Sequence, residues 1–140
     1  MRFAGNSVYN GAMIHITHSF SSFSVTDLAA AKQFYSETVG LSWEEQPGMG
    51  LNLMLPGGGS LFIYPKADHV PATYTVLNFV VENIDTTVDE LIAKGVTFDK
   101  YDGMHQDERG IARGIAAKMG PDIAWFKDPA GNILSVLQEK

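Results

Sequence analysis

The sequence contains no cysteine and few basic residues. Without cysteine there are no disulfides, no thiolate zinc ligands and no cysteine nucleophiles, and the composition fits the cytoplasmic location that we expect. Lys and Arg number 10 against 16 Asp and Glu, which gives a net charge of −6. An acidic chain is a poor partner for nucleic acid or for an anionic membrane, because both carry negative charge. No stretch approaches the ~20 apolar residues that a membrane helix needs.

The rest of the composition is typical of a folded domain. Hydrophobic residues make up 45% of the 140 residues and charged residues 19%. This length suits one domain or two small fused modules. The first twelve residues lack the basic segment and apolar run of a secretory signal. We interpret residues 1–12 as an N-terminal extension, with Met13 as an alternative start.

The first half of the chain predicts one strand, one helix and three further strands. Residues 13–25 alternate apolar and polar side chains and contain several β-branched residues, as strands do. A helix is expected from its cap at Asp27 to about Val39, with Gly40 as the stop, because apolar side chains recur every three or four residues. The three strands that follow are expected around residues 43–46, 51–55 and 61–64.

The second half predicts the same order of elements. A strand is expected at 74–81, followed by a helix that Asp85 caps and that ends near Lys94. A strand at 96–101 and a long loop at 102–114 come next, and a loop of this length is also typical of active-site lids. The chain is then expected to close with a hairpin of strands at 123–127 and 133–138.

Two offsets support an internal repeat. Residues 25–28 align with 81–84 at an offset of 56, and Gly59 aligns with Gly131 at an offset of 72. We therefore predict an α+β protein built from two βαβββ modules. The predicted boundaries are a first module at 13–65, a linker at 66–73 and a second module at 74–140.

Two motifs resemble those of a known family. The segment from Phe23 to Leu41, with its Phe34-Tyr35 pair, and the segment Ala124-Trp-Phe-Lys-Asp-Pro-Ala-Gly-Asn-Ile-Leu resemble the vicinal oxygen chelate superfamily. That superfamily includes glyoxalase I, bleomycin and fosfomycin resistance proteins, and extradiol dioxygenases. The resemblance implies two modules whose mixed sheet curls into an open cup with the helices outside, and it implies a homodimer.

Metal-dependent members of that family carry up to four ligands on the first and last strands of each module. The family alignment and the repeat offsets together select Phe20, Ile63, Val76 and Ser135, and a slip of one residue would exchange Ile63 for Tyr64. Three of these side chains have no donor atom, and a serine hydroxyl is a weak neutral ligand. We therefore expect no metal or other cofactor in the cup.

The residues expected to line the cup are aromatic, aliphatic and amide side chains, with one histidine. Strand alternation places them on corresponding faces of the two modules. The alternative is a filled core, because aromatic residues on curved sheets often pack against one another. His18 in particular either binds a polar ligand group or acts as a base, or it is a histidine that is hydrogen-bonded at the rim. The predicted ligand-binding residues are His18, Phe20, Ile63, Tyr74, Val76, Asn78, Trp125 and Ser135.

These observations lead to three functional interpretations. The first is a protein that binds a small apolar or aromatic molecule without a metal, as bleomycin resistance proteins do. The second is a glyoxalase-like lyase or a dioxygenase-like oxidoreductase with an atypical metal site built from His18, a shifted acidic residue or a partner chain. The third is a dimeric interaction module with a vestigial cup. The sequence assigns no catalytic residue.

Overall fold

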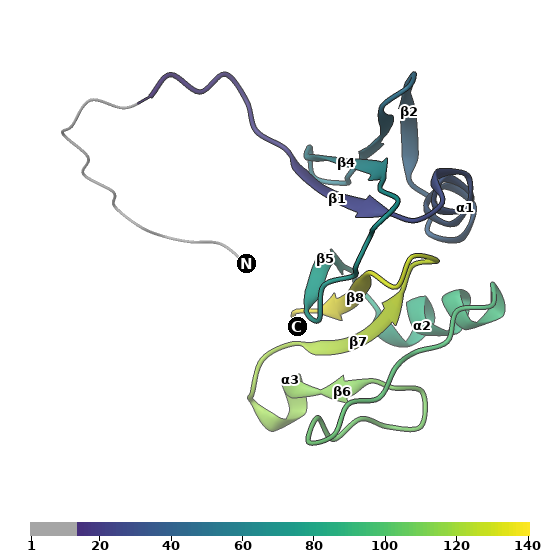
Figure 1. Ribbon diagram of the computed structural model, residues 1–140. Coiled ribbons are helices and arrows are strands. Elements are labelled where there is room, and N and C mark those ends of the chain that lie inside the picture. The colour runs from purple at the N-terminus through teal and green to yellow at the C-terminus, as the bar shows by residue number, and fades with distance from the viewer. Residues whose placement is uncertain (1–13) are drawn as a thin grey trace.

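The computed structural model describes residues 14–140, which form two four-stranded sheets with a helix packed against each (Figure 1). The predicted extension at 1–12 lies outside the described residues. The first sheet has the strand order β1-β4-β3-β2, in which β1 and β4 are parallel and the other neighbours are antiparallel. Its elements are β1 (Ser21–Val25), α1 (Leu28–Gln33), η1 (Phe34–Thr38), β2 (Ser42–Gln46), β3 (Gly50–Met54) and β4 (Ser60–Pro65).

The second sheet repeats this arrangement with the order β5-β8-β7-β6, so the predicted α+β fold of two βαβββ modules is confirmed. Both longer helices lie on the same side of the molecule in Figure 1. No helix within residues 14–140 is long and apolar enough to cross a membrane. The module boundaries stay a prediction. The elements of the second module are β5 (Thr75–Val80), α2 (Ile84–Ala93), β6 (Ala112–Arg113), α3 (Gly114–Ala117), β7 (Asp122–Lys127) and β8 (Ile133–Gln138).

The two main helices begin at polar caps. Asp27 caps α1, as expected, with its carboxylate accepting backbone hydrogen bonds from Ala29 and Ala30. The predicted cap of α2 is wrong, because Asn83 rather than Asp85 occupies the extended cap position and accepts from the backbone of Thr86 at 3.0 Å. Asp85 therefore lies inside the first turn, where its carboxylate is free to bind other groups.

The helix that was expected to reach Val39 changes its hydrogen-bond pattern on the way. After α1 the chain continues as the π-helix η1, in which the backbone of Val39 donates to Phe34 five residues earlier at 3.0 Å. Gly40 ends it with a φ of +89°, a conformation that favours glycine. Tyr35 is fully buried and Phe34 partly buried, and the two rings meet edge to face with centroids 5.1 Å apart.

Two predicted strands are shorter than expected. Ser21 pairs with Leu61, and β4 begins at Ser60, so residues 14–20 extend past the end of the neighbouring strand and stay exposed. The predicted strand at 96–101 reduces to one bridge between Asp99 and Trp125. One edge strand of the second sheet, β6, lies inside the segment predicted to be a loop.

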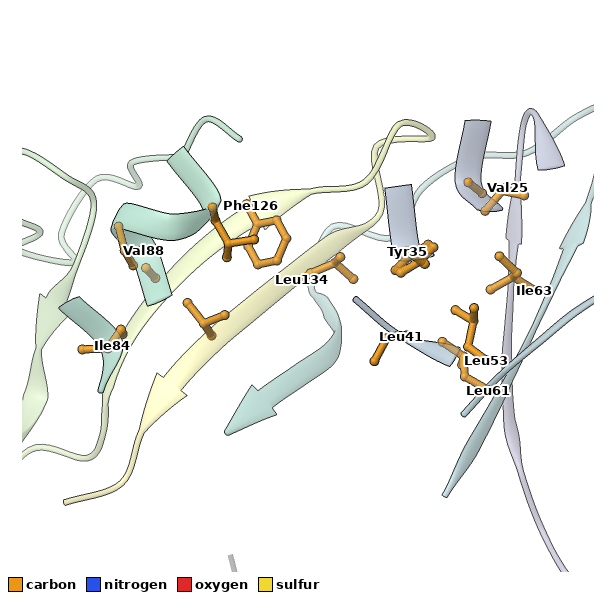
Figure 2. Packing of buried hydrophobic residues seen from close by; sticks show 14 of the residues in the cluster. Val25, Tyr35, Leu41, Leu53, Leu61, Ile63, Ile84, Val88, Phe126 and Leu134 are labelled. Carbon is orange, nitrogen blue, oxygen red and sulfur yellow. The ribbon is translucent and has the colours of Figure 1, made fainter. Parts of the chain in front are cut away.

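One hydrophobic core extends through both modules (Figure 2). Figure 2 shows Tyr35 of the first module pointing toward Leu134 of the second. Each large side chain that is fully buried contributes about 1.5–3 kcal/mol to folding. The fully buried members include Val25, Tyr35, Leu51, Leu53 and Ile63 from the first module and Ile84, Val88, Phe126 and Leu134 from the second.

A buried polar network joins the two modules next to this core. The Tyr35 hydroxyl donates to one carboxylate oxygen of Asp128 at 2.7 Å, and the other oxygen accepts from the backbones of Ala130 and Asn132, each at 2.9 Å. The Asn132 side chain donates to Asp128 at 2.9 Å and to the Ser24 carbonyl at 3.0 Å. Burial and the neighbouring Asp128 raise the pKa of Tyr35 far above its usual range, so the phenol stays protonated.

His69 in the connection between the modules strengthens the same junction. Its Nε2 lies 3.1 Å from the Ala130 carbonyl, which only accepts, so Nε2 carries the proton. In the neutral ring Nδ1 then accepts from the Ser24 hydroxyl at 2.6 Å. His69 thus bridges β1 and the turn between β7 and β8, and this role was not apparent from the sequence.

Candidate functional site

Alternation along the strands divides each sheet into a face that packs against the helices and an opposite face, here called the open face. In β4, Leu61 and Ile63 are fully buried in the core, whereas Phe62 and Tyr64 between and after them are partly exposed. In the second sheet, Ala124, Phe126, Leu134 and Val136 belong to the core. The residues between them therefore point to the open face.

His18 and Phe20 lie together at the open face of the first sheet. Both are exposed, and their rings stack at a centroid distance of 6.4 Å. With Asn52, Met54 and Phe62 they line a shallow cavity of about 430 Å³. The structure thus brings these two predicted ligand-binding residues into one apolar cavity.

Ile63 points into the core and not toward the cup. It was expected in the cup because the two hairpin turns were aligned on the wrong glycine. The two hairpin turns have the same hydrogen bonds at an offset of 73, and the glycine that corresponds to Gly131 (φ +86°) is Gly58 (φ +103°), not Gly59. Strand pairing agrees, because Ser22 pairs with Phe62 and Asn78 with Ser135. The position that corresponds to Ser135 is therefore Phe62.

Val76 also does not lie on the open face where it was expected, because β5 contains a bulge. Thr75 pairs with Ile133 and Leu77 with the next residue, Leu134, so Val76 is an extra residue without an opposite partner. Its half-buried side chain packs against the core. The bulge interrupts the alternation that was expected to run from Tyr74 through Val76 to Asn78.

Three other predicted residues form a row across the open face of the second sheet. Ser135 is fully buried and lies between Asn78 on one neighbouring strand and Trp125 on the other. The Ser135 hydroxyl donates to the amide oxygen of Asn78 at 2.5 Å. Within residues 14–140 the amide nitrogen of Asn78 has no hydrogen-bond partner, and the side chain is exposed. The row therefore ends in a donor that a ligand can reach.

Tyr101 continues this row beyond Trp125. The two rings are perpendicular, with centroids 5.6 Å apart. Burial and the nearby Asp99 carboxylate raise the pKa of Tyr101, with Lys127 acting in the opposite direction, so the phenol is neutral at neutral pH. Tyr74 and Met104 lie against the same side of Trp125 and share a small cavity with it.

Gln106 holds the loop that carries Tyr101. Its side-chain oxygen accepts from the Tyr101 backbone at 2.7 Å, while its nitrogen donates to the carbonyls of Asp99 and Gly110 at 2.9 and 2.7 Å. Asp99 is fixed in turn to β7, because its backbone donates to the Trp125 carbonyl at 2.8 Å. Sequence reasoning missed Gln106, because a single glutamine in a polar loop has no pattern that distinguishes it.

Two arginines tie the far end of this loop to α2. Arg109 pairs with Asp85 and, at 2.7 Å, with Asp89, and Arg113 pairs with Asp85 at 2.6 Å and Asp107 at 3.3 Å. Hydrogen bonds from Arg113 and then Arg109 lower the pKa of Asp85 well below its usual range. Burial would raise the pKa of Asp107, but backbone amides of Ile111 and Arg109 and the Arg113 charge together lower it.

Acid should weaken the attachment of this loop to α2, because carboxylates with lowered pKa values stabilise the fold only while they are ionised. The contribution is complete above the unfolded-state pKa of about 4 and is lost as the pH falls toward the folded-state values. Arg113→Gln should cost about 1–2 kcal/mol at pH 7 and flatten the loss of stability below about pH 5. Urea unfolding from pH 7 downward measures both effects.

The matched control is Lys66→Gln, which removes the cation of the exposed Lys66–Asp68 pair in the linker. It should leave the free energy of unfolding nearly unchanged, because an exposed ion pair is screened by solvent. An Arg113→Gln protein with the same pH profile as the parent would show that the loop is held by other contacts.

The residues at the positions implied by the family resemblance do not fit a divalent ion. Ile63 lies in the core, Val76 has no donor atom, and the Ser135 hydroxyl is already bonded to Asn78. Among residues 14–140 no group of three or more His, Cys, Asp or Glu side chains could hold a metal ion. Whether the protein binds a metal stays a prediction that elemental analysis can test.

Comparison with known proteins gives one family and many related structures. The family described as Glyoxalase/Bleomycin resistance protein/Dioxygenase superfamily matches residues 13–136. No curated protein matches. TnmS3, an antibiotic binding protein from Streptomyces sp. CB03234, is 27% identical with a TM-score of 0.62, over 90% of this chain and 100% of that one.

Two further structures are similar to this chain. A glyoxalase/bleomycin resistance protein from the same Streptomyces strain is 28% identical with a TM-score of 0.57, over 86% of this chain and 100% of the other. The fosfomycin resistance protein FosX from Listeria monocytogenes has a TM-score of 0.65 at 13% identity, over 91% of this chain and 96% of that one. At that identity the likeness concerns the fold alone.

Proposed function

We propose that this chain, which belongs to the glyoxalase/bleomycin resistance protein/dioxygenase superfamily, binds a small planar molecule on the open face of its second sheet. The observation that carries the proposal is the row of Tyr101, Trp125, Ser135 and Asn78, which combines an aromatic surface with a free amide donor. Small-molecule sites typically pair apolar surface with a few placed polar groups. The likeness to TnmS3, described as an antibiotic binding protein, supports the same function.

The row also indicates the chemistry of the ligand. The hydrogen bond from Ser135 fixes the amide oxygen of Asn78 and turns its nitrogen toward solvent. A planar ring lying along Trp125 would then place a carbonyl or similar acceptor at that nitrogen. The ligand class is therefore an aromatic molecule with a hydrogen-bond acceptor at one end.

A matched pair of probes tests this assignment. 2-Acetonaphthone carries a carbonyl on a naphthalene ring, and 2-ethylnaphthalene has a similar shape without the acceptor. In a ¹⁵N NMR titration, 2-acetonaphthone should shift the Trp125 indole signal and bind about 5-fold more tightly than the hydrocarbon, which corresponds to one net hydrogen bond. Asn78→Ala should remove that preference, because it removes the donor.

Trp125→Ala should abolish binding of both probes, whereas Trp43→Phe, which alters an exposed tryptophan in β2 near Lys32, should leave it unchanged. Equal affinities for the two probes in the parent protein, or shifts confined to the His18 and Phe20 cavity, would contradict the proposal.

We propose further that two copies of the chain form a dimer that brings open faces together. The strands β1 and β5 are sheet edges, and exposed apolar side chains lie on them or directly before them, with Phe20, Tyr74 and Val80 all more than half exposed. Unpaired edges with apolar side chains favour association. His18 and Phe20 would then face the second-sheet row of a partner copy. The cysteine-free sequence is compatible with such a dimer in a reducing cytoplasm.

Sedimentation equilibrium tests the dimer. The parent protein should have twice the chain mass of 15.3 kDa at micromolar concentration. Val80→Lys on the β5 edge should shift it to the monomer, while Val70→Lys, at an exposed linker position, should not. A parent protein that stays monomeric at 100 micromolar would refute the dimer.

A further inference from the structure

A small cavity lies at the end of the proposed binding row that is farther from Asn78. It has a volume of about 270 Å³ and lies between the start of β5, the loop after α2 and β7. Four aromatic or thioether side chains from three separate segments meet there, together with one carboxylate. The residues that carry the argument are Tyr74, Tyr101, Asp102, Met104 and Trp125.

The aromatic walls of this cavity form a corner. Tyr101 and Trp125 meet at 89° with centroids 5.6 Å apart, so they present two surfaces at right angles to the space between them. Tyr74, which is 69% exposed, adds a third ring at the mouth. The faces of aromatic rings carry partial negative charge and attract cations within about 6 Å of the ring centre.

The carboxylate of Asp102 makes the same cavity more attractive to a cation. Asp102 is exposed, and within residues 14–140 it has no ion-pair partner. Its neighbour Asp99 differs, because Lys127 lies 3.5 Å from the Asp99 carboxylate and compensates its charge. Asp102 is therefore the carboxylate at this cavity whose charge a ligand can neutralise.

Hydrogen bonds within the chain hold the corner in place. Gln106 anchors the Tyr101 backbone at 2.7 Å and the Asp99 carbonyl at 2.9 Å, and Asp99 is bonded to the backbone of Trp125. A turn between Met104 and Tyr101 closes the loop at 3.3 Å. A site whose walls are held in place loses little conformational entropy on binding.

We propose that this cavity binds an organic cation, such as an alkylated ammonium group, between Tyr101, Trp125 and Asp102. The proposal deepens the proposed function and rests on it, because Tyr101 and Trp125 serve both sites. It predicts that the natural ligand carries a cationic group attached to the planar part that lies along the row. Gln106 is the positioning residue, since it holds Tyr101 without reaching the ligand.

Choline and its neutral isostere 3,3-dimethylbutan-1-ol test the inference with the complete chain. In a ¹⁵N NMR titration at 150 mM salt, choline should shift the signals of Trp125 and Tyr101 with an affinity about 10-fold above that of the isostere. Asp102→Asn should lower the choline affinity about 3- to 10-fold. Asp68→Asn, which neutralises an exposed linker carboxylate, should not change it.

The positioning role of Gln106 has its own readout. Gln106→Leu should lower choline affinity about as much as Tyr101→Leu does, and Tyr101→Phe should retain most of it, because the ring remains. Urea unfolding of each variant separates loss of the site from loss of the fold.

The other possible results of the titrations would each overturn one of the two proposed sites. Equal affinities for choline and the isostere would overturn the inference and leave an apolar cavity. No saturable shift with either probe up to 50 mM would also overturn it. If 2-acetonaphthone binds in its own titration while choline does not bind, the proposed function stands and the cation site fails. If choline binds and 2-acetonaphthone does not, the planar-ligand site fails instead.

Discussion

Replacing Asp128 with alanine should lower the free energy of unfolding by roughly 3–5 kcal/mol. The Asp128 carboxylate accepts from the Tyr35 hydroxyl, from the Asn132 side chain and from two backbone amides in the turn between β7 and β8. Alanine leaves these donors without an acceptor in a site where Asp128 itself is only 4% exposed. Urea denaturation at pH 7 measures the loss.

Three further substitutions separate the contribution of the buried junction from that of the turn between β7 and β8. Pro129→Ala changes an exposed residue of the same turn and should cost less than about 1 kcal/mol. Tyr35→Phe removes one donor, and its effect combined with Asp128→Asn should be less than additive, because the two side chains share a hydrogen bond. If Asp128→Ala is as stable as Pro129→Ala, the network does not hold the modules together.

Replacing Ile63 with glutamate should prevent the chain from folding at 25 °C. Ile63 is completely buried in the core beside Leu53 and Leu61, where a carboxylate finds no partner, and the penalty of several kcal/mol is comparable to the whole stability of a small domain. Circular dichroism and size-exclusion chromatography measure the result.

Tyr64→Glu is the matched control, because Tyr64 follows Ile63 in β4 and is partly exposed on the open face. It should fold and lose less than about 1.5 kcal/mol. The comparison also tests whether residue 63 is the position of a metal ligand in the family, since a ligand introduced there could not act from inside the core. A folded Ile63→Glu protein would mean that β4 has the opposite face toward the cup.

Local signals in the sequence predicted most of the fold, because each depends on a few neighbouring residues. Asp27 and Gly40 delimit the first helix, as their cap chemistry requires, and the paired motifs led to the correct βαβββ topology. The predicted strand at 13–25 is too long, because strand length depends on the partner strand. The register of Ser21 against Leu61 shows where that partner begins, and no property of residues 14–20 reveals it.

The candidate site was harder to predict, since the errors came from single-residue shifts. Aligning Gly59 rather than Gly58 with Gly131 exchanged the two faces of β4, and the bulge at Val76 did the same to the start of β5. Side chains alternate across a strand, so one residue moves a predicted ligand contact into the core. Asn78, Trp125 and Ser135 lie after the bulge or on the hairpin itself, where the alternation is undisturbed.

The buried junction also constrains how the chain can fold during biosynthesis. Tyr35 lies 93 residues ahead of its acceptor Asp128, and the carbonyl of Ser24 lies 108 residues ahead of Asn132. At 5–20 residues per second, a ribosome needs about 5 to 20 s to supply Asp128 after Tyr35. The first module therefore cannot bury the Tyr35 hydroxyl against its acceptor until the turn between β7 and β8 is made. The junction between the modules should form only after Asp128 and Asn132 have been synthesised, and the nascent first half should be a substrate for chaperones until then.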